Sequence, residues 1–115
     1  MLSVERLGVL LAPKDENHAK FNAGMVKQGD KVHMVYRWSK QNGIATDANE
    51  KRTGIVYSDD FVSYAELTPE GKLVSDLDEQ GLIKYYIENP KTPVYAQDPR
   101  IVEFEGEYII SVSYT

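Results

Sequence analysis

Two segments of this 115-residue chain repeat one pattern, in which an apolar strand, a tight polar turn with glycine and a second apolar strand follow one another. The first segment covers residues 26–36 and turns at 28–31, and the second covers residues 102–112 and turns at 105–106. Glycine in so short a connection supplies a positive φ at little cost, which is typical of β-hairpins. The pattern therefore predicts a fold built mainly from antiparallel strands.

The rest of the chain fits the same class. Residues 53–57 predict another strand, with a turn at 58–60, and the eight tyrosines suit pleated surfaces better than helices. Residues 73–84 carry leucines at helical spacing, but Gly81 and a polar run limit them to one short helical turn. Loops or extended segments are expected at residues 14–20, 39–51 and 89–93.

The distance between the two hairpins indicates a larger architecture. They lie roughly 75 residues apart, which is too long for a simple solenoid and suits the blades of a β-propeller with loops between its strands. The chain stops in or just after a predicted strand, at residues 113–115. Because an open apolar sheet edge favours association, we expect that more protein follows or that this piece pairs with another copy.

Composition narrows the classes of function. The net charge of −5, with acids spread from Glu5 to Glu107, argues against a nucleic-acid surface. The absence of cysteine leaves no disulfide frame and no thiolate metal site, and His18 and His33 are isolated, so no metal site is predicted. The apolar run at residues 9–12 is far too short to cross a bilayer, so we expect one cytoplasmic domain without membrane contact.

Four short segments carry a family resemblance. They are FNAG at 21–24, VYR at 35–37, RTGIVYSDD at 52–60 and QDPRI at 97–101. In order and spacing they resemble glycoside hydrolase family 130, the β-mannoside phosphorylases and related hydrolases, over nearly the whole chain but only the first third or so of a typical member. The resemblance implies a five-bladed β-propeller with a central active site, of which residues 1–115 cover the first blade or blades.

The resemblance also implies a reaction. Phosphorylases of this family cleave a β-mannosidic bond with inorganic phosphate and invert the anomeric centre, which gives α-mannose 1-phosphate. The implied partners are a β-mannoside oligosaccharide and phosphate, with no other cofactor. Asp98 would be the acid that protonates the leaving oxygen, a role that burial supports by keeping a carboxyl neutral until it is used. The residues alone leave a plainer alternative open, in which Asp98 only begins a turn before the next strand.

Four residues match family positions that bind substrate. Asn22, Arg37 and Asp60 would hold the mannose next to the cleaved bond, because an amide, a guanidinium and a carboxylate suit hydroxyl groups held in fixed directions. Arg52 would lie near phosphate and sugar, where its planar fork of donors suits a dianion. Arg100 is expected to be structural and to anchor the loop that presents the acid.

Each of the four also has a structural alternative. Asn22 would cap a turn, Asp60 would be an ordinary hairpin-turn acid, and Arg37 would pair with a surface carboxylate. Arg52 would be a solvated charge beside other charged residues. An unrelated β-sandwich would leave the matching residues scattered.

The chain departs from the family pattern at three positions. Ala23 stands where proline is common, Gln97 where glutamate is common, and Phe61 where glycine follows the acid. The family's other phosphate ligands, and the glutamate pair of its hydrolytic branch, would lie beyond residue 115. Phosphorylase and β-mannosidase therefore both stay open, as does a non-catalytic carbohydrate-binding or assembly module. The fragment alone is expected to be inactive, because the pocket needs all five blades.

Overall fold

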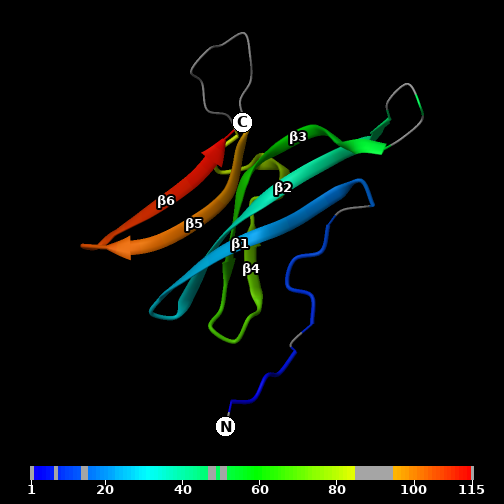
Figure 1. Ribbon diagram of the computed structural model, residues 1–115. Coiled ribbons are helices and arrows are strands. Elements are labelled where there is room, and N and C mark those ends of the chain that lie inside the picture. Colours follow the sequence, from blue (N-terminus) through cyan, green and yellow to red (C-terminus); the bar gives the residue numbers. More distant parts are fainter. Residues whose placement is uncertain are drawn as a thin grey trace.

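The computed structural model describes residues 2–6, 8–13, 16–46, 49, 52–84 and 95–114, with the side chains of 41–46 and 52–58 outside this description. These residues form an all-β structure of two antiparallel sheets, as the sequence predicts (Figure 1). The larger sheet contains, in chain order, β1 (His18–Gln28), β2 (Lys31–Thr46), β3 (Arg52–Leu67) and β4 (Leu73–Asp76). The smaller sheet pairs β5 (Ala96–Phe104) with β6 (Glu107–Tyr114).

Both predicted hairpins are confirmed. Gln28 pairs with Lys31, so β1 and β2 are joined by a two-residue turn in which Gly29 has a φ of 55°. Glu105 and Gly106 join β5 to β6 with φ values of 51° and 81°. Two consecutive positive φ angles are typical of the type I′ turn, whose twist matches that of the flanking strands.

The expected turn at residues 58–60 is wrong, and so is the loop expected at 39–51 over residues 39–46. β3 runs without interruption through Asp60, and β2 continues to Thr46. Lys40 pairs with Asp59 and Gln41 with Tyr57, so the register slips by one residue between them and β3 has a bulge there. These polar residues lie in strands because β2 and β3 pair over a long stretch, and the backbone hydrogen bonds of that pairing do not depend on side-chain polarity. The extended segment expected at 89–93 lies outside the described residues.

The predicted helical turn in residues 73–84 is confirmed as the 3-10 turn η1 (Asp78–Gln80). It follows β4, an edge strand that the sequence did not indicate, and Val62 then pairs with Ile83. Within the part of the chain that the structure describes, no helix has the length and apolar character needed to cross a membrane.

Side chains alternate between the two faces of the larger sheet, and both faces carry a core. Face A is defined by the buried cluster of Met34, Tyr36, Trp38, Phe61, Ala65 and Leu67. Face B is the opposite face, where Val35 and Val62 pack against Ala96 and Ile101 of β5. The β5–β6 hairpin therefore lies on face B, as Figure 1 shows.

The two hairpins are equivalent under an offset of 76 residues, the separation of Asn22 and Asp98. The offset takes the cross-strand pair Phe21–Arg37 onto the pair Gln97–Ser113. Immediately after Phe21 and after Gln97, the register of the first strand shifts by one residue. Each hairpin thus has a β-bulge at the same place.

The equivalence extends to packing. Under the same offset, Ile110 and Val112 of β6 correspond to Met34 and Tyr36 of β2. Ile110 and Val112 pack against face B of the larger sheet, whereas Met34 and Tyr36 belong to the core of face A. The second hairpin therefore meets the first through the side that corresponds to face A.

Candidate functional site

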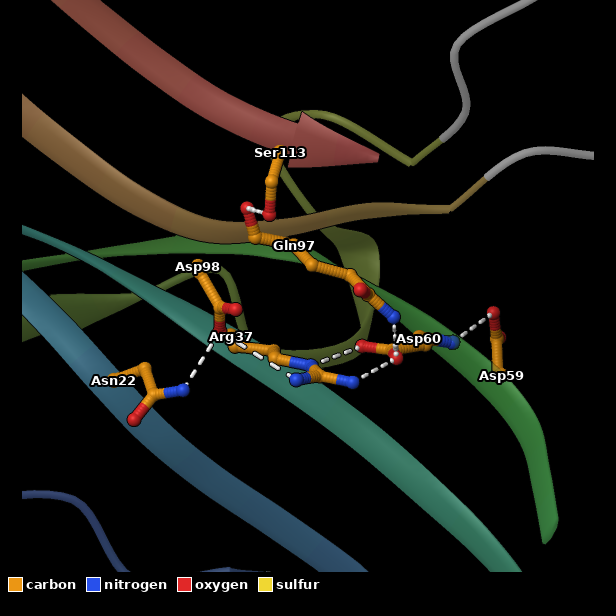
Figure 2. Close-up of polar contacts among 7 residues, drawn as sticks. All are labelled: Asn22, Arg37, Asp59, Asp60, Gln97, Asp98 and Ser113. Carbon is orange, nitrogen blue, oxygen red and sulfur yellow. Dashed lines mark hydrogen bonds and ion pairs between the residues drawn. The ribbon is translucent and has the colours of Figure 1, made fainter. Parts of the chain in front are cut away.

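Five polar side chains from four strands meet where the two hairpins pack together (Figure 2). They are Asn22 of β1, Arg37 of β2, Asp60 of β3, and Gln97 and Asp98 of β5. We term this set the Arg37 cluster. Four of its members are residues that the sequence predicted for the site, and they converge rather than scatter.

Two β-bulges present Asn22 and Asp98. Both residues have a left-handed backbone, with φ values of 52° and 50°, which asparagine and aspartate adopt more readily than other non-glycine residues. A bulge redirects a side chain out of the regular alternation of its strand. The two side chains point at each other, and Asn22 Nδ2 donates a hydrogen bond of 2.6 Å to Asp98 Oδ1 (Figure 2). Neither residue lies in the turn that the structural alternatives proposed.

Arg37 lies between the two carboxylates. Its Nε donates to Asp60 Oδ1 at 2.9 Å and its Nη2 to Asp60 Oδ2 at 2.6 Å, while its Nη1 lies 3.4 Å from Asp98 Oδ1. Its Cζ is 4.9 Å from the ring centre of Phe21, so the guanidinium also stacks on an aromatic face. Its main partner is a buried carboxylate, not the surface carboxylate of the alternative.

Asp60 is fully buried within β3. A buried carboxylate is stable only when it is paired and hydrogen-bonded, and Arg37 supplies the charge. Gln97 Nε2 adds a hydrogen bond of 2.6 Å to Asp60 Oδ2. This contact explains why glutamine is favoured at position 97, because glutamate there would place a second carboxylate against the buried carboxylate of Asp60. Sequence reasoning noted Gln97 only as a departure and missed its part in the site.

Asp98 is the accessible acid of the Arg37 cluster. Because 40% of its side chain is exposed, the burial that was expected to keep its carboxyl neutral is not found. Asn22 and Arg37 share its Oδ1, and no described residue donates a hydrogen bond to its Oδ2. Since Arg37 is already paired with Asp60, the cluster carries an excess of negative charge whenever Asp98 is ionised. Such a site can accept hydrogen bonds from hydroxyl groups.

The two remaining predicted residues, Arg52 and Arg100, are not among the residues that define the Arg37 cluster. Arg52 begins β3, but its side chain is outside the described residues. Arg100 Nη1 donates to the carbonyl of Pro99 at 2.8 Å, within the bulge that presents Asp98. Ser113, the counterpart of Arg37 in the second hairpin, donates from Oγ to the carbonyl of Gln97 at 3.3 Å.

A second polar cluster lies on face A and comprises Lys20, Tyr36, Trp38, Asp76 and Asp78; we term it the Lys20 cluster. Lys20 Nζ is 2.9 Å from Asp76 Oδ2 and 3.5 Å from Asp78 Oδ1. Tyr36 donates to Asp76 Oδ1 at 2.5 Å, and Trp38 Nε1 donates to Asp78 Oδ1 at 2.8 Å. These contacts join β1 and β2 to β4 and η1.

The environment of the Lys20 cluster fixes its protonation states. Burial raises the pKa of Asp76, but hydrogen bonds from Tyr36 and Lys20 outweigh burial and hold that pKa below its ordinary value. Burial, and then the hydrogen bond to Asp76, raise the pKa of Tyr36 well above its ordinary value. Near neutral pH the cluster therefore contains an ionised Asp76 and a neutral Tyr36. No local pattern in the sequence indicates this cluster, because Lys20 and Asp76 are 56 residues apart.

Among the described residues, no group of three or more histidine, aspartate or glutamate side chains is arranged to hold a metal ion. Comparisons with family models, with curated proteins and with solved structures find no match to this chain. The Arg37 cluster is therefore the feature from which a function is proposed.

Proposed function

We propose that this chain forms part of an inverting β-mannoside phosphorylase of the kind found in glycoside hydrolase family 130, with Asp98 as proton donor. The observation that supports this proposal is that Asn22 and Arg37 both contact Asp98, while Asp60 binds the same guanidinium of Arg37. The resemblance matches the first three with mannose contacts and Asp98 with the acid. They come from four strands, and Asn22 and Asp98 are 76 residues apart.

The way the hairpins repeat supports a propeller. The second hairpin meets face B through the side that corresponds to face A. A unit that always uses the same two faces builds a head-to-tail series, which closes into a ring when the rotation between units allows it. In this proposal β1–β4 are the first blade, β5–β6 begin the second, and further protein completes the ring.

In the proposed reaction, Asp98 transfers a proton to the oxygen of the leaving sugar, directly or through a sugar hydroxyl. Inorganic phosphate forms a bond to the anomeric carbon from the opposite side as the carbon–oxygen bond to the leaving sugar breaks. The products are α-mannose 1-phosphate and the released sugar. Asn22 and Arg37 hold Oδ1 of Asp98, which leaves Oδ2 to carry the proton.

The surrounding groups would position the mannose. The amide oxygen of Asn22 points away from Asp98 and is suited to accept a hydrogen bond from a hydroxyl (Figure 2). Asp60 is too deeply buried to bind sugar directly, so its proposed part is to orient Arg37. Arg52 is proposed for phosphate, on the resemblance alone.

The test is release of mannose 1-phosphate from β-mannobiose and inorganic phosphate by the full-length protein. Asp98→Asn should lower turnover by roughly 100- to 10,000-fold, the range for loss of a general acid. Asp30→Asn, at the exposed β1–β2 turn, is the matched control and should keep normal turnover. Near-normal turnover of Asp98→Asn would remove Asp98 from this role. Release of free mannose without phosphate dependence would assign the hydrolase of the same family.

A non-catalytic carbohydrate-binding module is the second candidate. The observation that favours it is that Arg37, Asp60 and Gln97 satisfy one another and leave few donors for a ligand. Calorimetric titration with β-mannobiose, with and without phosphate, separates the two. Binding that is independent of phosphate and accompanied by no turnover would assign the module.

A further inference from the structure

Gly24 lies where β1 passes close to β5. A Cβ atom built on Gly24 would stand 3.2 Å from Arg100 Cα, 3.2 Å from the Pro99 carbonyl oxygen and 3.4 Å from Ile101 N. These separations are shorter than the best distance for non-bonded heavy atoms, about 3.5–4.0 Å between carbons. All three atoms belong to the backbone, so no side-chain rotation relieves the contact. Any side chain at position 24 therefore requires β5 to move by a few tenths of an ångström.

Space, and not backbone conformation, is the reason for glycine at this position. Gly24 does not have a positive φ, and it pairs with Val35 in the ladder between β1 and β2. Other residues adopt such a strand backbone without strain. The approach of β5 is what excludes a side chain.

The close approach of β1 and β5 at Gly24 is adjacent to the contacts of Asp98. Gly24 follows Asn22 by two residues, and the atoms that it faces come directly after Asp98. The hydrogen bond from Asn22 to Asp98 Oδ1, at 2.6 Å, can lengthen by a few tenths of an ångström and persist. The hydrogen bond from Arg37 Nη1, already 3.4 Å long, cannot, although the two charges would still attract each other.

We propose that Gly24 is a positioning residue of the Arg37 cluster, whose missing side chain keeps Asp98 within reach of Arg37. Its consequence for turnover rests on the proposed function, whereas its effect on the Arg37–Asp98 contact does not. The phosphorylase chemistry needs Asp98 at a fixed place, and small misplacements of catalytic groups lower rates steeply.

The first experiment follows the guanidinium nitrogens of Arg37 by NMR in the full chain. In the protein with Gly24, Asp98→Asn should shift the Nη resonances of Arg37. In the Gly24→Ala background the same substitution should produce less than about half of that shift, since the 3.4 Å contact is lost. The Nε resonance, which reports the bond to Asp60, should stay in place.

The second experiment measures turnover of the full-length protein, as in the test of the proposed function. Gly24→Ala should lower kcat about 10-fold, with a smaller change in KM, because substrate contacts persist while the acid moves. Adding Asp98→Glu to Gly24→Ala should recover part of kcat, since the longer side chain spans the wider gap, whereas Asp98→Glu alone should only lower it. Gly29→Ala is the matched control, because its methyl group meets no atom within 4 Å. It should lower stability at most, since its φ is 55°.

The outcomes separate this proposal from the proposed function. An unchanged Arg37 response in Gly24→Ala overturns the positioning role, whatever the turnover. A diminished response in a protein without mannoside turnover supports positioning and counts against the phosphorylase. If Gly24→Ala unfolds in buffer, the spectra are recorded in trimethylamine N-oxide, which favours the compact state. A variant that stays unfolded there overturns the proposal, which requires only a small movement.

Discussion

The Arg37 and Lys20 clusters lie on opposite faces of one sheet and have the same ionic composition. Each contains a nearly buried cation, with 12% of Arg37 and 6% of Lys20 exposed, between two carboxylates of unequal exposure. The less exposed acids are Asp60 at 0% and Asp76 at 13%. The half-exposed acids, Asp98 at 40% and Asp78 at 41%, even share a φ of 50°. Exposure and charge therefore do not distinguish the proposed site from the Lys20 cluster.

The two clusters differ in where their acids come from. In the Lys20 cluster, Asp76 and Asp78 are two residues apart and belong to the larger sheet and the turn after it. In the Arg37 cluster, Asp60 belongs to the larger sheet and Asp98 to the second hairpin. The first cluster therefore stabilises one sheet, whereas the second spans the junction between two repeating units.

The largest expected effect is that of Arg37→Met, which leaves the fully buried Asp60 without a cation. Removing one partner of a buried ion pair costs roughly 3–5 kcal/mol, so the free energy of unfolding should fall by that amount in urea denaturation. Lys20→Met should cost less, because part of Asp78 remains hydrated. An equal or larger loss for Lys20→Met would break the comparison. Lys31→Met is the control at about 1 kcal/mol or less, since Lys31 is exposed and lies 3.9 Å from Glu66.

Asp76→Asn should cause the next largest loss of stability, and the size of this loss should depend on pH. The pKa of Asp76 is lower in the folded protein than its ordinary value of 3.8, so its ionised form stabilises the fold above that pH. This contribution is lost as the pH falls through the lowered pKa. Urea unfolding should show a deficit of about 1–3 kcal/mol for Asp76→Asn near neutral pH, which shrinks in acid. A deficit that is constant with pH would assign the loss to packing.

Tyr36→Phe should have a smaller effect, about 1–2 kcal/mol, because Asp76 keeps Lys20 as a partner. The raised pKa of Tyr36 means that its contribution is complete below the ordinary value of 10.0 and declines as the pH rises toward the folded value. The difference in stability between the wild type and Tyr36→Phe should therefore narrow in alkaline solution. Thermal unfolding at several pH values measures it, and a widening difference would contradict the assignment.

The smallest effect on stability is expected for Asp98→Asn, within about 1 kcal/mol, because the side chain is half-exposed and asparagine keeps an acceptor oxygen. Asp78→Asn is its matched partner by exposure and backbone. Both should unfold at similar urea concentrations, while only Asp98→Asn should lose turnover in the phosphorylase assay. Equal losses of turnover would show that the two clusters are not functionally distinct.

The elements that could be predicted from the sequence are those specified by residues close together in the chain. The hairpins at residues 26–36 and 102–112 were predictable because turn glycines and adjacent apolar strands specify them within a few residues. The uninterrupted β3 was not, because Asp59 and Asp60 are typical of turns, and only pairing with β2 shows them to be in a strand. Burial of Asp60 depends on Arg37 and Gln97, which are 23 and 37 residues away.

Asn22, Arg37, Asp60 and Asp98 were predicted to share a site from the family resemblance and not from periodicity. Nothing in the spacing of Asn22, Arg37 and Asp98 indicates that they meet. The Lys20 cluster was missed because Lys20 lies in a segment expected to be a loop, and Asp76 and Asp78 lie in a segment interpreted as a helical turn. Contacts between distant segments depend on the packing of both hairpins, which local patterns do not encode.

The bulges also decide how easily such a site is gained or lost. Asn22 and Ala23 together oppose one residue of β2, so deletion of Ala23 would keep every other cross-strand pair of β1 and turn only Asn22 toward face A. Deletion of Pro99 would likewise remove the bulge of β5 and turn Asp98 to the other face of its own hairpin. In evolutionary terms, a single-codon insertion in each hairpin is enough to direct two polar side chains at each other, and an otherwise regular sheet accommodates both.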